Sequence, residues 1–137
     1  MKKLIGILLL IATAVSLFAL TSCSRGNGNQ NLWDSATYTE DTELGSGAKT
    51  ISVEVVGNDK KVTFTIHTDK ATLGEALLEH ELIVGKDGLY TKVNGMTADY
   101  TIDMTYWMLY INGDMAMVGM DDAVISEGSV YKIEYTK

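Results

Sequence analysis

Residues 106–113 read YWMLYING and combine the clearest strand and the clearest turn of the chain. Strict alternation divides the strand into two faces, one with Trp107, Leu109 and Ile111 and the other with Tyr106, Met108 and Tyr110. Both faces are apolar or aromatic, which predicts a central strand covered on both sides or a strand with one aromatic face open to a partner. The Asn-Gly pair that follows suits a two-residue hairpin turn, because both of its residues tolerate positive φ.

Two further strands precede this hairpin in the chain. Residues 50–56 and 61–67 each alternate apolar with polar side chains, which is typical of strands with one buried face. Residues 57–60 read GNDK and supply turn residues between them. The pair therefore predicts an antiparallel hairpin with a four-residue connection.

One short helix is expected after the first hairpin. Thr72 and Glu75 have the spacing of a capping box, in which the hydroxyl and the carboxylate satisfy two free backbone N–H groups. Apolar residues continue at helical spacing, so we expect about three turns that end before Gly85. Several short strands and a final strand over residues 129–136 follow. The order predicts an α+β fold, a β-grasp-like mixed sheet with one short helix packed on it, over residues 50–137.

The N-terminal region has the features of a lipoprotein signal peptide. Lys2 and Lys3 precede an apolar run over residues 4–20, and residues 20–23 read LTSC, which fits a bacterial lipobox. We expect residues 1–22 to be removed and Cys23, the only cysteine, to carry the lipid. Residues 23–49, rich in Gly, Asn, Ser and Thr, would then form a lipid-anchored flexible tether. The predicted location is the extracytoplasmic side of the cell membrane.

The charge of the chain excludes one class of partner. The sequence has 18 acidic and 11 basic residues, and loss of the signal peptide would remove two of the basic ones. A phosphate-binding surface needs positive charge, so we expect neither nucleic acid nor anionic head groups as partners. The scattered acids are interpreted as a solvated surface.

Segments from residue 51 to the C-terminus resemble a known domain family in their order. They are TLGEAL at 72–77, GLY at 88–90, VNG at 93–95, YWMLYING at 106–113 and EGSVY at 127–131, where Ser129 replaces an acidic residue. Together they are similar to a domain of unknown function in bacterial surface lipoproteins, related to the C-terminal β domain of transcobalamin and intrinsic factor. The resemblance implies an extracellular binding module. In the vitamin carriers, cobalamin lies between this domain and a helical barrel, which this sequence does not contain.

Two functions remain open at this stage. The first is a ligand-binding module for cobalamin or a related corrinoid, with no resident cofactor. The second is a surface protein-interaction or adhesion domain with no small ligand, whose partner would be a transporter or surface protein. The candidate ligand-binding residues form an aromatic and thioether-rich group around the hairpin: Tyr106, Trp107, Met108, Tyr110, Asn112 and Met117.

Catalytic and metal-binding motifs are weak in this sequence. No Ser or Cys nucleophile stands in a pattern with a His and an acid, so we expect no enzyme. The two histidines, His67 and His80, are interpreted as an exposed strand residue and a helix-end residue. Scattered aspartates could bind calcium, and Met115, Met117 and Met120 could bind copper(I), but we favour solvated turns for the aspartates and core packing for the methionines. We therefore predict no metal site.

Overall fold

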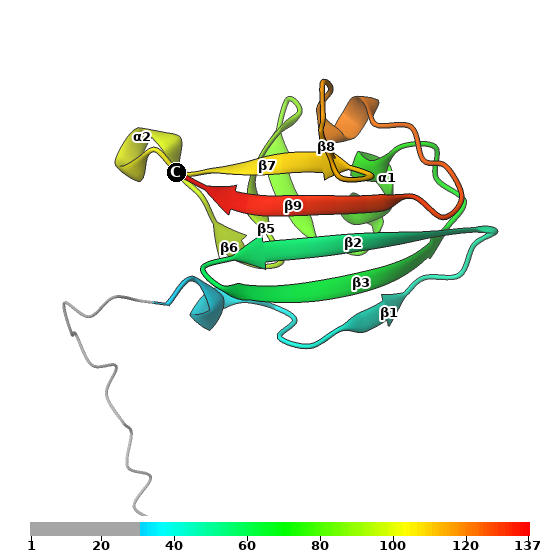
Figure 1. The fold of residues 1–137 in the computed structure, drawn as a ribbon, viewed down its shortest axis with the longest axis horizontal. Coiled ribbons are helices and arrows are strands. Elements are labelled where there is room, and N and C mark those ends of the chain that lie inside the picture. Colours follow the sequence, from blue (N-terminus) through cyan, green and yellow to red (C-terminus); the bar gives the residue numbers. More distant parts are fainter. Residues whose placement is uncertain (1–30) are drawn as a thin grey trace, which may run out of the picture.

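A computed structural model describes residues 31–137 and has an α+β fold (Figure 1). The predicted fold class is confirmed, since strands dominate and a short helix packs against them. In chain order, the elements are η1 (Leu32–Ser35), β1 (Thr42–Leu44), β2 (Lys49–Gly57), β3 (Lys60–Thr68), α1 (Leu73–Glu79), β4 (Ile83–Lys86), β5 (Leu89–Val93), β6 (Met96–Thr97), α2 (Tyr100–Asp103), β7 (Tyr106–Ile111), β8 (Asp114–Met115), η2 (Met120–Asp122) and β9 (Val130–Thr136).

The main sheet has six strands in the order β1-β3-β2-β9-β7-β8. The central strands β2 and β9 are parallel, and each has an antiparallel neighbour on its outer side, β3 and β7 respectively. Because α1 lies between the two strand pairs in sequence, these four strands have the topology of a β-grasp. The chain inserts a smaller sheet, β4-β5-β6, between α1 and β7.

The core lies between the inner face of the main sheet and the elements that cover it. Alternate residues of β2, β3 and β9 point into this layer, as the period of a strand requires. Leu73, Ala76 and Leu77 of α1 pack against them from the other side. The largest fully buried side chains include Tyr131, Phe64, Ile51 and Ile66.

Helix α1 begins as predicted but is shorter. Thr72 accepts a hydrogen bond from the Glu75 N–H at 3.3 Å, and the Glu75 carboxylate accepts one from the Thr72 N–H at 3.2 Å, which is a complete capping box. The helix has seven residues, about two turns rather than three. It ends because Glu81 adopts a positive φ of 55°, which cannot continue a right-handed helix.

The hairpin turns use residues with positive φ. Asn112 and Gly113 have φ of 49° and 89°, which confirms the predicted two-residue turn after β7. The turn between β2 and β3 is tighter than predicted. Strand pairing continues to Gly57 and Lys60, so only Asn58 and Asp59 connect the strands, with φ of 46° and 68°. Asn and Asp tolerate positive φ well, so two residues are enough for a connection that was expected to need four.

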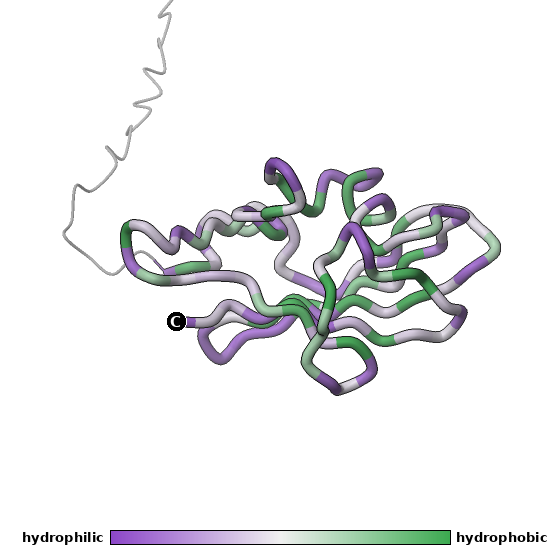
Figure 2. Tube along the Cα trace, turned by 90° about the horizontal axis from the view of Figure 1, so that it is seen from above, coloured by the Kyte–Doolittle hydropathy of each residue, from purple (hydrophilic) through white to green (hydrophobic). Residues whose placement is uncertain are grey.

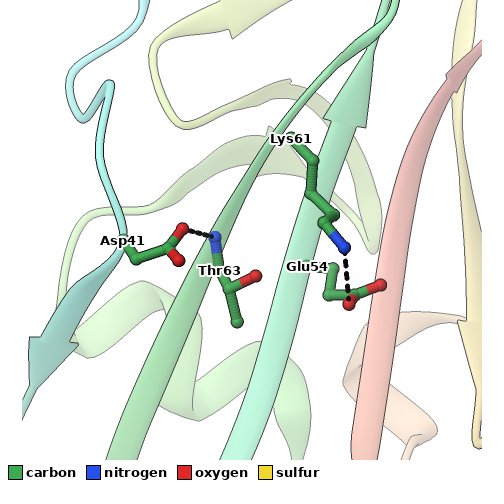
Figure 3. A network of polar contacts seen from close by, with 4 residues as sticks. All are labelled: Asp41, Glu54, Lys61 and Thr63. Atoms are coloured by element: carbon green, nitrogen blue, oxygen red, sulfur yellow. Dashed lines mark hydrogen bonds and ion pairs between the residues drawn. The ribbon is translucent and has the colours of Figure 1, made fainter.

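The structure differs from the expected flexible tether over residues 31–49. The Trp33 side chain is only 5% exposed, and its indole N–H donates to the Gly57 carbonyl at 2.7 Å. Further along, β1 pairs in parallel with β3, and the Asp41 carboxylate accepts from the Thr63 N–H at 2.9 Å (Figure 3). Burial of a large aromatic ring outweighs the low apolar content of this segment. The predicted signal peptide and lipidated Cys23 lie outside the described residues.

Candidate functional site

A partly open groove of about 440 Å³ runs along one side of β7. Its walls come from β5 and the turn before it, from α2 and the residue that precedes β7, from β7 itself, and from the segment after β8. Apolar and aromatic side chains dominate the lining: Leu89, Tyr90, Ala98, Tyr100, Tyr106, Trp107, Met108, Leu109, Ala116, Val118 and Met120, with Gly88, Thr91, Thr105 and Gly119 between them. This composition is typical of sites for small, mainly apolar ligands.

The groove follows a strand edge that is only partly paired. Strand β9 pairs with β7 along its whole length, whereas β8 pairs with only Tyr110 and Ile111. Beyond these, the Ala116 N–H donates to the Leu109 carbonyl at 2.9 Å. Among residues 31–137, no strand pairs with the first half of β7 on this side. Side chains from both faces of the strand can therefore reach the groove, Trp107 and Leu109 from the inner face and Tyr106 and Met108 from the outer face.

Trp107 is held in place from two directions. Its indole N–H donates to the Thr91 carbonyl of β5 at 3.2 Å, which links the main sheet to the small sheet. Its ring also meets the Tyr135 ring edge-on, with centroids 5.4 Å apart. A wall fixed in this way loses little conformational entropy when a ligand binds.

Tyr90 forms a second fixed point of the groove wall. Its hydroxyl donates to the Asp121 carboxylate, which links β5 to η2. Burial, followed by the hydrogen bond and the negative charge of Asp121, raises the pKa of Tyr90 to about 12. The hydroxyl therefore remains a neutral donor across the physiological pH range.

The structure brings three of the six predicted ligand-binding residues together. Tyr106, Trp107 and Met108 line the groove, whereas Tyr110, Asn112 and Met117 are not among its lining residues. The Lys132 ammonium lies 4.2 Å from the centre of the Tyr110 ring on the outer face of the sheet. The Asn112 side chain accepts from the Val130 N–H at 2.9 Å and fixes the hairpin. Met117 is 94% exposed.

Several lining residues were missed from the sequence. Leu89 and Tyr90 belong to a segment quoted above for its family resemblance, but the short strand gave no sign of facing β7. Tyr100 and Thr105 lie in and after α2, a helical turn that apolar periodicity did not predict. Met120 was considered as a metal ligand, and the structure buries it at 6% exposure in the core.

The acidic residues of the described part of the chain can be compared with the requirements of a metal site and of helix capping. No group of three or more His, Cys, Asp or Glu side chains within residues 31–137 is arranged to hold a metal ion. Asp99 caps α2 by accepting from the N–H groups of Thr101 and Ile102 at 2.9 and 3.2 Å. The hydrogen bond from the Thr101 hydroxyl lowers the pKa of Asp99. This carboxylate therefore has a structural role.

His67 of β3 is less exposed than predicted and contacts a residue of β2 and a residue of the edge strand β1. Its Nδ1 lies 2.9 Å from the Thr50 hydroxyl, and its Nε2 lies 2.6 Å from the Glu43 carboxylate of β1. The three residues form a hydrogen-bonded chain on the outer face of the sheet, and none of them lines the groove. Their contacts fasten β1 to β3.

Comparison with known proteins finds a family model and solved structures that resemble part of this chain. Residues 71–137 match the family described as Domain of unknown function (DUF4430). No curated protein matches the sequence at a significant level. A candidate metal-binding protein from Ruminococcus gnavus ATCC 29149, of known crystal structure, is 26% identical with a TM-score of 0.62, and the match covers 66% of this chain and 98% of that chain.

A second solved structure gives a weaker match. Haptocorrin, crystallised in complex with Cbi, is 17% identical with a TM-score of 0.48. The match covers 69% of this chain but only 26% of haptocorrin, so this chain corresponds to about a quarter of that protein.

The described helices are all short. None of those within residues 31–137 has the length and apolar character needed to cross a membrane.

Proposed function

We propose that this chain is a non-catalytic, lipid-anchored module that binds a flat, mainly apolar ligand outside the cytoplasmic membrane. The groove beside β7 is the observation that carries this proposal. It combines an apolar, aromatic lining with a small number of polar groups, and its walls are tied together by Trp107 and Tyr90. Such a preformed site suits a planar ring that stacks on aromatic side chains.

A corrinoid is the first ligand to test. The ordered sequence segments described above resemble the β domain of the vitamin carriers, and three candidate residues from that reasoning line the groove. The groove is open on one side, so it can cover only part of a large ring. We therefore expect modest affinity in isolation, with a second protein completing the site for tighter binding.

Metal binding is not part of this proposal. The Ruminococcus gnavus protein is described as a candidate metal binder, but its similarity here is at 26% identity. Within residues 31–137 of the present chain, the carboxylates and imidazoles do not gather in threes.

The direct test is equilibrium dialysis of the full chain in detergent micelles against cobinamide and cobalamin. We expect saturable binding of one ligand per chain. Empty micelles serve as the control for partition of the ligand into detergent. Absence of saturable binding at high micromolar ligand would contradict the corrinoid assignment, and an apolar planar dye tested in parallel would show whether the groove binds flat rings at all.

The unpaired half of β7 favours a second function, recognition of an extended protein segment. In an antiparallel sheet, the N–H and C=O of one residue point to the same side of the strand, and this side alternates along the chain. The Leu109 carbonyl accepts from Ala116 on the open side of β7. The backbone groups of Trp107, two residues earlier, therefore point to the same open side. A partner strand could pair there. A photo-crosslinking residue in place of Val118, at the groove wall, would then yield one discrete protein adduct in cells, whereas a small-ligand site predicts none.

A further inference from the structure

Helix α2 and the residue that caps its C-terminus expose three large apolar side chains. Tyr100, Ile102 and Met104 are 62%, 81% and 60% exposed. We call these three residues the α2 patch. Single exposed apolar residues are common on protein surfaces, but three within five positions concentrate apolar surface at one turn.

The turn that carries the α2 patch is held in a defined conformation. Asp99 caps the first N–H groups of α2, and its own N–H donates to the Thr105 hydroxyl at 2.9 Å. Thr105 is 4% exposed, and its hydroxyl also donates to the Asp103 carboxylate. The Thr105 hydroxyl therefore links the two ends of the turn. Met104 adopts a left-handed φ of 63°, which is uncommon for methionine. These contacts fix the turn in a conformation in which its apolar side chains face the solvent.

The α2 patch lies at the end of the molecule where the described chain begins. Asn31 and Leu32 share a surface hollow with Asp103, the last residue of α2. Figure 1 shows α2, the C-terminus and the first described residues, in blue, at the same end of the molecule. Seen from above, this end has a hydrophobic tip (Figure 2).

The docked N-terminal segment leaves little chain between this end and the predicted lipid. Residues 24–30 separate Cys23 from Asn31. At about 3.6 Å for each residue step, that stretch reaches no further than about 29 Å. A domain of about 100 residues has a radius of gyration of about 13 Å, so this reach is comparable to the width of the domain. A lipid on Cys23 would therefore keep Asn31, and the end of the molecule that it shares with α2, within about 29 Å of the bilayer.

We propose that the α2 patch docks on the surface of the bilayer that holds the lipid anchor. This inference rests on the lipid attachment in the proposed function. Tyrosine is suited to the membrane interface because its ring is apolar and its hydroxyl is polar, and Ile102 and Met104 supply the apolar contact below it. Asp34, Asp99 and Asp103 lie in or near this end of the molecule, so the matching surface is one of zwitterionic rather than anionic head groups.

Docking in this way would orient the groove. Tyr100 lines the groove, and its ring lies 6.3 Å from that of Tyr106, which also lines it. One wall of the groove would thus be next to the membrane surface. An apolar ligand could then reach the site from the lipid phase as well as from water.

A single-site fluorescent label tests this inference. The lipid occupies the thiol of Cys23, the only cysteine, so Ile102→Cys creates one free thiol in the full acylated chain. An environment-sensitive dye on this thiol should show blue-shifted and several-fold brighter emission in phosphatidylcholine vesicles than in the same protein after its removal from lipid. Ile102 is 81% exposed, so the substitution should leave the thermal transition unchanged.

A matched label at the other end of the molecule is the control. Val124 is an aliphatic residue that is 73% exposed, and the segment between η2 and β9 that contains it lies at the opposite end from α2 (Figure 1). Its dye should keep the emission seen in water. Equal emission at both positions would overturn docking on lipid. A change at position 102 that occurs in native membranes but not in phosphatidylcholine vesicles would also overturn it, because it would identify a membrane protein as the partner. Mass spectrometry that finds no lipid on Cys23 would instead remove the anchoring that the proposed function requires.

Discussion

The inner face of the main sheet and the side of the molecule with the groove use similar residues in different ways. Phe64, Val53 and Ile133 have no exposed surface, whereas Leu89 beside the groove is 75% exposed. Strands pair on both sides of the central strands that carry the core face, but no strand pairs with the first half of β7 on its open side. The comparison teaches that apolar residues stabilise the fold where pairing is complete and become available for binding where pairing stops.

The largest expected effect separates these two regions directly. Phe64→Ala should lower the free energy of unfolding by about 3–5 kcal/mol, because it leaves a cavity in the core. Leu89→Ala should change it by less than about 0.5 kcal/mol, since that side chain is largely in water. Urea denaturation followed by circular dichroism measures both. Equal losses for the two variants would break the distinction.

The N-terminal segment provides the next test, because its sequence resembles a linker while its structure resembles the core. Trp33→Ala should lower the free energy of unfolding by about 3 kcal/mol, the lower part of the range for a buried aromatic residue. Hydrogen exchange of residues 31–48 should accelerate in the same variant. Unchanged exchange and stability would show that this segment behaves as a tether after all.

A smaller effect is expected at the start of α1. Thr72→Ala removes the side-chain acceptor of the capping box and should cost about 1 kcal/mol in the free energy of unfolding. Thr72→Ser is the matched control, since it retains the hydroxyl and should recover most of this stability. A similar loss in both variants would point to the methyl group rather than to the cap.

The pH dependence of the groove wall sharpens the comparison further. The Tyr90 side chain loses its proton near pH 10 in the unfolded chain and near pH 12 in the folded chain. The contribution of Tyr90 to stability is therefore fully present below pH 10 and is lost as the pH rises to about 12. The stability difference between wild type and Tyr90→Phe should therefore be constant below pH 10 and shrink above it. Denaturation curves across this range measure the effect, and a constant difference throughout would contradict the bond to Asp121.

The sequence predicts the parts of this fold that depend on local pattern. Alternation identified the strands that became β2, β3, β7 and β9, and Thr72 with Glu75 located the start of α1. Docking of the N-terminal segment was not predictable in this way, because it depends on Trp33 meeting Gly57, which lies 24 positions away.

The candidate site was predictable only in part for the same reason. Tyr106, Trp107 and Met108 belong to one conspicuous strand, so their grouping follows from sequence alone. Tyr90 and Tyr100 reach the groove through the small sheet and through α2, whose positions are set by long-range contacts such as the bond from Trp107 to Thr91. Tyr110 shares a strand face with Tyr106, but the groove does not extend to it.

This last pair offers the most direct test of the claim that the groove is the binding site. Tyr106 and Tyr110 lie on the same strand and point to the same face, yet only Tyr106 lines the groove. In equilibrium dialysis of the full chain against cobinamide, Tyr106→Ala should weaken binding about tenfold, because one stacking side chain contributes on the order of 1.4 kcal/mol. Tyr110→Ala should bind as wild type does. Equal affinities for the two variants, or a loss confined to Tyr110→Ala, would contradict the assignment of the groove.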